Sequence, residues 1–336
     1  MRKYEIKTIL IVILILITSS LMGQEKRAQA GMKFLSVANS ARVSGMGEAV
    51  TAVESSSMAM FFNPAGMARQ TNFVDITLGQ TEWIADINYM YGSASFAPFD
   101  GDYGIIGFSL TSVDYGKLNR TVRKGADGYE DLGTFSPTAI SMGVGYAKAL
   151  SDKFSVGGNI KYVRQSLGDH VTALDGSGGY SYENFETNVL AFDFGIIYRT
   201  GFRSLNFGMS IRNFSEEIKY IEESFQLPLT FKIGFSMNMS DLLEFDKETH
   251  SILVAVDASH PRDYDEQINI GLEYTLFNSV SFRAGYITPT DEQGINAGIG
   301  IKQSLMGVNF GFDYAYTDFG VFDNLHRFTV SFSYWF

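Results

Sequence analysis

Few side chains in this sequence are spaced for catalysis. The four histidines fall in predicted loops or at the ends of predicted strands: His170, His250, His260 and His326. Of these, His170 together with Ser166 or Ser177 would supply the base and the nucleophile of a hydrolase. The sequence contains no cysteine, no G-x-S-x-G, no phosphate loop and no H-E-x-x-H motif. We therefore expect a protein that is not an enzyme and that needs no cofactor.

One acidic cluster has the donor atoms of a calcium site. Asp263, Asp265 and Glu266 lie beside His260, and Ca²⁺ prefers carboxylate oxygens as ligands. Their spacing lacks the pattern of a calcium-binding loop, which favours a solvated acidic turn. We expect no metal site.

Strands with a period of two residues must position the remaining polar side chains. At the C-terminus, five residues are apolar at every second position: Phe328, Val330, Phe332, Tyr334 and Phe336. Polar residues lie between them from Arg327 to Ser333. An alternating last strand that ends on an aromatic residue is typical of bacterial outer-membrane β-barrels, which the assembly machinery of that membrane inserts. The same residues also fit the last strand of a soluble sandwich.

Similar alternation recurs along the chain after residue 72 and predicts fourteen strands. They lie near 72–80, 85–97, 102–114, 135–150, 153–167, 184–199, 203–213, 228–240, 249–260, 265–277, 279–288, 293–303, 305–317 and 325–336. Short connections alternate with long ones at Tyr115–Thr134, Gly168–Glu183, Phe214–Leu227 and Asp318–Asn324. Strands of this length and loops sorted in this way predict an all-β, antiparallel transmembrane barrel over residues 72–336 rather than a sandwich.

The N-terminus predicts export. Arg2, Lys3 and Lys7 precede the apolar run Ile9–Ile17, the layout of a signal peptide over residues 1–23. Cleavage would follow Gly23 or, at the A-x-A pattern, Ala30. The alternative is a retained helical anchor, for which this run is short. Together with the barrel, an exported chain predicts the bacterial outer membrane, where lipid and lipopolysaccharide surround the protein.

Composition agrees with a barrel and excludes nucleic acid as a partner. Aromatic residues make up 14% of the chain, with 34 glycines and only 6 prolines, and the mean hydropathy is +0.01. The net charge of −11 would repel the phosphates of a nucleic acid. In a membrane barrel the polar face of each strand lines the lumen. This register predicts eight inward charges: Lys161, Lys232, Asp257, Glu273, Arg283, Lys302, Asp313 and Arg327. They would pair with one another or with a plug, or guide a solute.

Residues 31–70 do not alternate and are rich in small side chains. Gly45-Met46-Gly47 lies at their centre, and Asn63-Pro64-Ala65-Gly66 near their end. Asn63 suits a helix N-cap and Pro64 the first helical position. We therefore expect short helices and turns, packed as a plug in the barrel mouth.

The segment FLSVANSARVSGMGEAVTAVESSSMAMFFNPAGMARQ resembles the N-terminal signature of the PorV/PorQ family, outer-membrane proteins associated with type IX secretion. The resemblance rests on Arg42, Gly45, Met46, Gly47, Asn63, Pro64, Ala65 and Gly66. It implies a FadL-like barrel of fourteen strands with an N-terminal plug.

The resemblance leaves two functions open. For PorV/PorQ relatives it implies binding of the C-terminal domain of secreted cargo, or of the translocon. Four aromatic residues of the outer loops would then be anchors: Tyr129, Tyr180, Tyr182 and Phe185. For FadL-like relatives it implies uptake of fatty acids or other hydrophobic solutes past the plug. Inward kinks at Gly157-Gly158 or at Gly143 and Gly145 would assist such a path.

Overall fold

The computed structural model describes residues 30–124, 128–174, 179–242, 246 and 249–334. The predicted signal peptide at residues 1–23 lies outside the described residues, as do Ser177, Trp335 and Phe336.

Fourteen antiparallel strands close into one barrel, with β1 paired to both β2 and β18. The barrel strands are β1 Val74–Glu82, β2 Asn88–Phe96, β3 Ile105–Asp114, β6 Thr138–Ala149, β7 Phe154–Leu174, β8 Tyr180–Arg199, β9 Asn206–Ser215, β12 Thr230–Asn238, β13 His250–Pro261, β14 Gln267–Leu276, β15 Val280–Thr288, β16 Ile295–Leu305, β17 Val308–Thr317 and β18 Leu325–Tyr334. The predicted all-β barrel of fourteen strands is confirmed.

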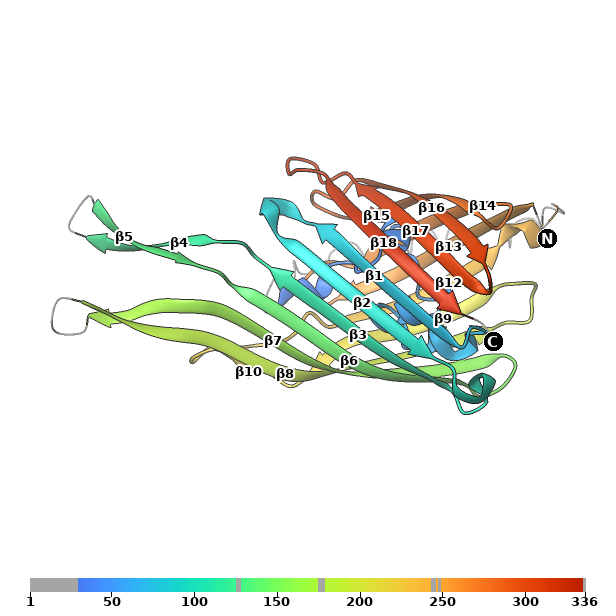
Figure 1. Ribbon diagram of the computed structural model, residues 1–336, viewed down its shortest axis with the longest axis horizontal. Helices are drawn as coiled ribbons and strands as arrows, with labels where there is room; N and C mark the ends of the chain where they lie inside the picture. The colour runs from blue at the N-terminus through green and yellow to red at the C-terminus, as the bar shows by residue number, and fades with distance from the viewer. Residues whose placement is uncertain (1–29, 125–127, 175–178, 243–245, 247–248, 335–336) are drawn as a thin grey trace, which may run out of the picture.

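Strands project far beyond the barrel at one end, which we call the outer end, whereas only turns project at the opposite, inner end (Figure 1). At the outer end, β4 (Leu118–Lys124) and β5 (Gly128–Phe135) form a separate hairpin, and β7 and β8 extend beyond their barrel neighbours. A small sheet of β10 (Ile218–Lys219) and β11 (Ser224–Phe225) lies between β9 and β12 in sequence. The connections 115–134 and 168–183, which we predicted as loops, consist largely of strands, and 214–227 contains two short strands within a loop.

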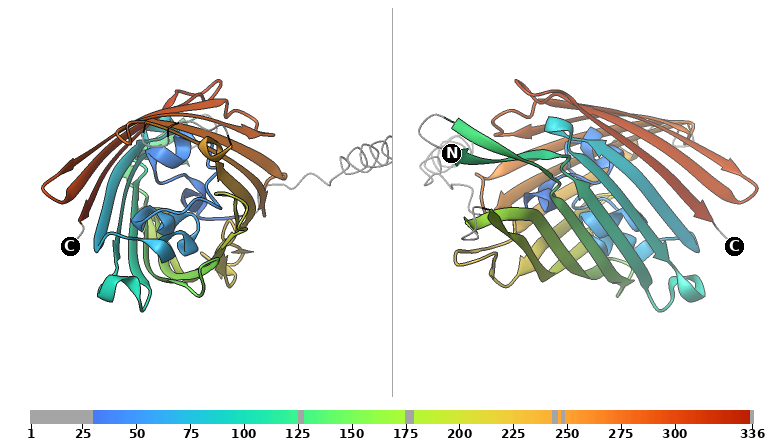
Figure 2. Two further views of the ribbon diagram at one scale, coloured as in Figure 1. Left: turned by 90° about the vertical axis from the view of Figure 1, so that its right-hand side faces the viewer. Right: turned by 60° about the vertical axis from the view of Figure 1, so that its left-hand side comes forward.

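Residues 31–70, which we call the interior segment, lie inside the ring of strands (Figure 2). The segment holds three 3₁₀ helices and one α-helix: η1 Lys33–Ser36, α2 Ala41–Gly45, η2 Ser57–Phe61 and η3 Pro64–Arg69. Three further 3₁₀ turns belong to connections: η4 Ile84–Asp86, η5 Pro98–Gly101 and η6 Met239–Asp241. Within the described part of the chain, no helix is long and apolar enough to span a membrane.

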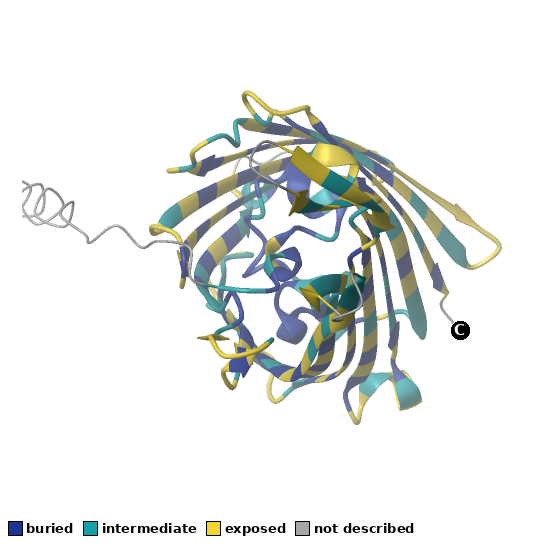
Figure 3. Cartoon of the chain, turned by 90° about the vertical axis from the view of Figure 1, so that its left-hand side faces the viewer, coloured by how far each residue is buried: buried dark blue, intermediate teal, exposed yellow. Residues whose placement is uncertain are grey.

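Burial alternates along the strands (Figure 3). Outward side chains such as Phe108, Phe312 and Val330 are large, apolar and exposed, whereas their neighbours in sequence are polar or small and are buried or half-buried. This is the reverse of a soluble protein, and it is the arrangement that lipid requires of a barrel. Phe328, Phe332 and Tyr334 also face outward on β18.

The interior segment runs from the outer end to the inner end. Its first residues reach the outer connections, because Gly31 N–H donates to Gln226 O at 3.0 Å and Lys33 pairs with Asp263. Its last residues reach the inner end, where Arg69 donates to Ser151 O at 2.6 Å. An apolar cluster around Phe34, which includes Tyr89 and Leu227, closes the outer mouth.

Candidate functional site

Glycines in the barrel wall bring the interior segment into backbone contact with the strands. A Cβ added at Gly285 of β15 would lie 2.0 Å from Gly47 N, and one at Gly271 of β14 would lie 2.4 Å from Met46 O. Gly47 itself has a φ of +58°, a conformation that favours glycine. The Gly45-Met46-Gly47 stretch therefore sits against β14 and β15 at a distance that side chains would prevent.

A chain of buried ion pairs fixes the same part of the segment. Arg42 contacts both carboxylate oxygens of Glu273, at 2.9 and 2.7 Å. Arg283 donates to Glu273 at 2.6 Å and to Asp313 at 2.7 Å. Two guanidinium groups and two carboxylates therefore alternate, so that charge is balanced within a site shielded from water.

A second polar cluster lies on the other side of the lumen. Lys161 of β7 is 2.8 Å from Asp193 of β8 and donates to Asn213 Oδ1 at 2.6 Å. Asp193 also accepts from the backbone N–H of Asn213 at 2.8 Å. Asn213 has a φ of +61° at a bulge where the β8–β9 register shifts. The charge pair therefore ties three strands together at the bulge.

Backbone groups of the interior segment are bonded to side chains of the wall. Asp257 accepts from Val50 N, Thr51 N and Thr51 Oγ1, at 3.0, 3.0 and 2.7 Å. Asn63 caps η3 by accepting from Ala65 N at 3.1 Å and donates to Thr51 O at 2.6 Å. These bonds satisfy polar groups that no regular sheet or long helix would pair.

Seven of the eight predicted lumen charges are buried at the wall, and the exception is Lys302. Lys302 is exposed and lies three residues before the end of β16, at the inner end. Lys232 lies 3.7 Å from Glu48 of the interior segment. Arg327 donates to Thr317 at 2.9 Å and lies over the ring of Trp83, with no carboxylate within salt-bridge distance among the described residues.

Of the four glycines for which we predicted strand kinks, Gly145 and Gly157 contact the interior segment, whereas Gly143 and Gly158 contact only residues of the barrel wall. A Cβ at Gly157 would lie 2.4 Å from Ala65 N, and one at Gly145 would lie 2.5 Å from Met60 Sδ. A Cβ at Gly143 would meet the side chains of Ser109 and Asn159. Close packing is therefore a sufficient reason for these residues.

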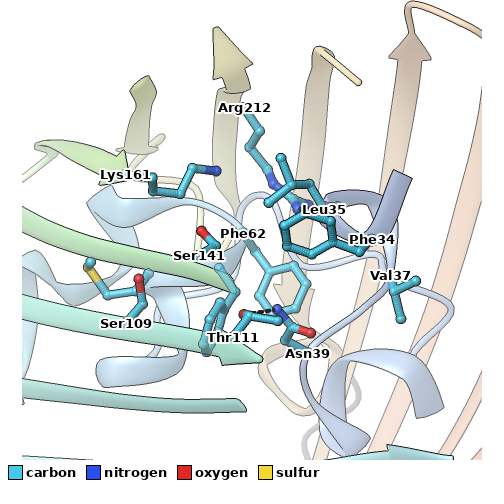
Figure 4. Close-up of a pocket in the computed structure, with 12 residues that line it drawn as sticks. Phe34, Leu35, Val37, Asn39, Phe62, Ser109, Thr111, Ser141, Lys161 and Arg212 are labelled. Carbon is cyan, nitrogen blue, oxygen red and sulfur yellow. Dashed lines mark hydrogen bonds between the residues drawn. The ribbon is translucent and has the colours of Figure 1, made fainter. Parts of the chain in front are cut away.

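Small cavities lie beside the interior segment among the described residues. A cavity between Phe34, Phe62 and Arg212 has a volume of about 20 Å³ (Figure 4). Such a volume holds about one ordered water molecule. Lys161 and Arg212 both border this cavity, and Arg212 donates to Leu35 O at 3.2 Å. A fatty acid would need this packing to open before it could enter.

Outside the barrel, side chains join the β4–β5 hairpin to the extended part of β7 and β8. The guanidinium of Arg120 lies 5.7 Å from the ring centroid of Phe135 and 5.1 Å from that of Tyr182. Glu130 accepts from Tyr180 at 2.9 Å and pairs with Lys124 at 3.1 Å. Both hydrogen bonds lower the pKa of Glu130, that from Tyr180 most strongly. We call β4, β5 and the parts of β7 and β8 that extend beyond the barrel the paired hairpins.

The four predicted aromatic anchors have different surroundings in the paired hairpins. Tyr129 and Tyr182 are 75% and 50% exposed. Tyr180 is bonded to Glu130, and Phe185 packs on His170 with ring centroids 5.7 Å apart. Tyr129 and Tyr182 therefore offer the most free aromatic surface of the four.

The residues considered for catalysis and metal binding have structural contacts. A ring nitrogen of His170 lies 3.0 Å from Leu167 O, and its ring packs on Phe135. His260 lies 2.8 Å from Glu266, and Asp263 pairs with Lys33. Among the described residues, no group of three or more His, Asp or Glu side chains is arranged to hold a metal ion.

The paired hairpins were not predicted from the sequence as regular structure. Asp127-Gly128 and Asp175-Gly176 are Asp-Gly dipeptides, the strongest local signal for a hairpin turn. In sequence, the first lies where β5 begins, at Gly128, and the second lies between the end of β7 at Leu174 and the start of β8 at Tyr180. No local sequence signal marks Asp193, Asn213 or Arg120 as site residues, because the residues that they contact lie on other strands.

Solved structures with the same fold include two toluene transporters and a FadL homologue. The Pseudomonas putida toluene transporter TodX has a TM-score of 0.60 and 12% identity, over 93% of this chain and all of its own. The Ralstonia pickettii toluene transporter TbuX has 0.58 and 13%, over 88% and 98%. A Pseudomonas aeruginosa FadL homologue has 0.54 and 13%, over 88% and 97%. Among curated proteins, none matches the sequence.

The sequence also matches a protein family. Residues 128–332, from β5 to near the end of β18, match the type IX secretion system membrane protein PorP/SprF. The match supports the secretion system predicted above but names a different family from PorV/PorQ, and it leaves out residues 31–70, on which that resemblance rests. With a FadL-like barrel whose apolar face is outward, the chain resides in the bacterial outer membrane. It belongs to the PorP/SprF family of type IX secretion membrane proteins.

Proposed function

We propose that this protein is a non-enzymatic component of type IX secretion that binds other proteins at its outer end. The observation that carries the proposal is the paired hairpins, which extend beyond the other barrel strands at the outer end (Figure 1) and contact each other through Arg120 and Tyr182. The interior segment acts as a plug, held by the Arg42–Glu273 ion pair and the glycine contacts. Family membership supports a role in secretion.

The partner is secreted cargo, through its C-terminal domain, or the translocon itself. Tyr129, Tyr182 and Arg120 suit such an interface, because aromatic residues and arginine dominate the binding energy of protein contacts. β4 carries cations such as Arg120 and Lys124, and its partner strand β5 carries acidic groups such as Glu130 and Asp131. An interface with both signs of charge favours selective over non-specific binding.

The test is a pull-down of tagged protein from the native outer membrane in a mild detergent, read by mass spectrometry. Wild type should recover the translocon, or secreted proteins that share a C-terminal domain. In a matched variant, a two-residue turn replaces residues 116–136, so that β3 and β6 still pair from Asp114 and Thr138. This variant should fold but lose the partners.

A control variant keeps the paired hairpins and changes a different outer turn, with Asp291→Ala and Glu292→Ala together. It should recover the same partners as wild type. The proposal is wrong if the variant without the β4–β5 hairpin recovers them equally well, or if folded wild type recovers none.

A second candidate function is transport of a hydrophobic solute. Fold similarity to toluene transporters favours it, as does the apolar cluster at the outer mouth. The bulge at Asn213 would be the place where the wall yields. Solvent extraction of protein purified from its native membrane should then release a fatty acid or hydrocarbon, in an amount close to one molecule per barrel.

A further inference from the structure

Three turns at the inner end hold large apolar side chains in an unfavourable backbone conformation. Phe99, Phe277 and Met306 have φ values of +53°, +50° and +51°. Tight hairpin turns need this left-handed conformation, and glycine, asparagine and aspartate adopt it most readily. An outer turn follows the rule more closely, since Ala85 and Asp86, at +57° and +58°, are small and polar.

These side chains are also exposed. Phe99 is 75% exposed, Phe277 69% and Met306 93%. Packing within the described protein therefore does not account for bulky apolar residues at these positions. A contact with something outside the chain would account for them.

All six turns at the inner end share this property. Each carries at least one exposed large apolar side chain: Phe99, Leu150, Phe202, Leu242, Phe277 and Met306. We call this set the turn-tip ring. The turns connect six different strand pairs, so the ring follows the whole circumference of the barrel. A planar membrane surrounds a barrel on all sides, whereas a globular partner protein covers one side.

The height of the lipid-facing band also indicates that the membrane, rather than a protein, contacts the turn-tip ring. On β6 the outward apolar residues run from Ile140 to Tyr146. At the usual rise and tilt of barrel strands they cover about 15 Å, which is short of the roughly 25 Å apolar band of outer-membrane barrels. Leu150, on the same face, extends this run to about 25 Å. Lys148 lies between them, and its long side chain can reach the interface.

We propose that the turn-tip ring is embedded in the phospholipid leaflet on the periplasmic side of the outer membrane. The inner turns then end within the boundary between headgroups and acyl chains. The barrel sits low in the bilayer, and its periplasmic surface consists mainly of the inner end of the interior segment, near Arg69 and Glu54. Burial of the apolar tips in lipid offsets the unfavourable turn conformation.

The chain has no cysteine, so single spin labels can measure depth directly. Phe99→Cys, Phe277→Cys and Met306→Cys are labelled with a nitroxide and reconstituted into phospholipid vesicles that contain no other protein. Collision rates are measured with oxygen, which concentrates in lipid, and with a water-soluble nickel chelate. We expect all three tips to collide several-fold more with oxygen relative to nickel than a label at an outer turn.

Two reference labels calibrate the result. Phe312→Cys, midway along the outward face of β17, reports lipid, and Asp86→Cys at the outer β1–β2 turn reports water. Heat-modifiable migration on a gel shows that each labelled variant is folded. Nickel accessibility at the tips equal to that at position 86 would overturn the proposal, and would leave the ring free for a periplasmic protein.

Discussion

The interface of the interior segment with the barrel wall differs in kind from the paired hairpins. The first consists of buried ion pairs, backbone contacts at glycines and backbone groups bonded to Asp257 and Asn63. The second consists of exposed cation–π contacts and hydrogen bonds between Arg120, Glu130 and three aromatic rings. The contacts of the interior segment are buried and fixed in one arrangement, whereas the contacts of the paired hairpins are exposed and can rearrange.

This difference in the contacts suggests that the two regions have different roles. A buried charge network has a single low-energy arrangement, because any lost partner leaves a charge unpaired in a medium of low dielectric constant. Exposed contacts are individually weak, so strands joined by them can shift when a partner binds. We infer that the interior segment keeps the barrel closed and that recognition belongs to the paired hairpins.

The largest effect should follow from a break in the buried network. Glu273→Gln leaves both Arg42 and Arg283 without their shared carboxylate, and should lower the free energy of unfolding by about 3–5 kcal/mol. Urea unfolding of the protein in lipid vesicles measures it. Glu266→Gln, at an exposed outer turn, is the control and should change the value by less than about 1 kcal/mol. Equal effects would contradict the distinction between the two regions.

A smaller effect is expected on the outward face of the barrel. Phe312→Arg places a charge midway along β17, and should cost about 2–4 kcal/mol in a bilayer. Ile295→Arg, near the outer edge on β16, should cost about 0–1 kcal/mol. The same unfolding experiment compares them. If both variants lost the same stability, the assignment of strand faces and membrane depth would be wrong.

The paired hairpins should show a small change in stability and a large change in binding. Arg120→Ala removes contacts to Phe135 and Tyr182 and should cost about 0.5–1 kcal/mol. In the pull-down it should greatly reduce recovery of partners. Arg120→Lys keeps the charge and should restore part of the binding. A stability loss as large as that of Glu273→Gln would show that the hairpins belong to the rigid part of the protein.

The smallest effect should be a pH response at the hairpin contact. Hydrogen bonds from Tyr180 and then Lys124 lower the pKa of Glu130. Their contribution is therefore complete above the ordinary pKa of a glutamate and is lost as pH falls through the lowered value. Cleavage of the hairpins by a protease active in acid should rise over that range. Glu130→Gln should remove the pH dependence, and a wild type without such a rise would refute it.

Much of the barrel could be predicted from the sequence, because lipid imposes a period of two on every strand. The alternation in Phe328–Tyr334 predicts both a strand and its outward face. The β4–β5 hairpin was missed because its polarity does not follow a period of two: Arg120 lies at the same parity as Leu118 and Val122. In water either face of a hairpin can be polar, so local periodicity carries less information.

The candidate site was only partly predictable. Strand register places Glu273, Arg283 and Asp313 on the lumen face, but nothing in the sequence pairs them with Arg42, more than 200 residues away. The bulge at Asn213 was also unpredictable, since it depends on Asp193 from the neighbouring strand. Lys302 shows the limit of the register argument, because the face of a strand does not reveal how close a residue lies to the rim.

The path of the interior segment decides on which side of the membrane each end of the described chain lies. Gly31 lies at the outer mouth, bonded to Gln226, and the segment descends to Arg69 beside Ser151 before β1 begins. Over the described residues, from Ala30 to Tyr334, the chain therefore traverses the thickness of the barrel fifteen times, once as the interior segment and fourteen times as a strand. An odd number of crossings places Ala30 and Tyr334 on opposite sides. A reporter peptide fused just before residue 30 would be displayed to the exterior, and one fused after the last strand would face the periplasm.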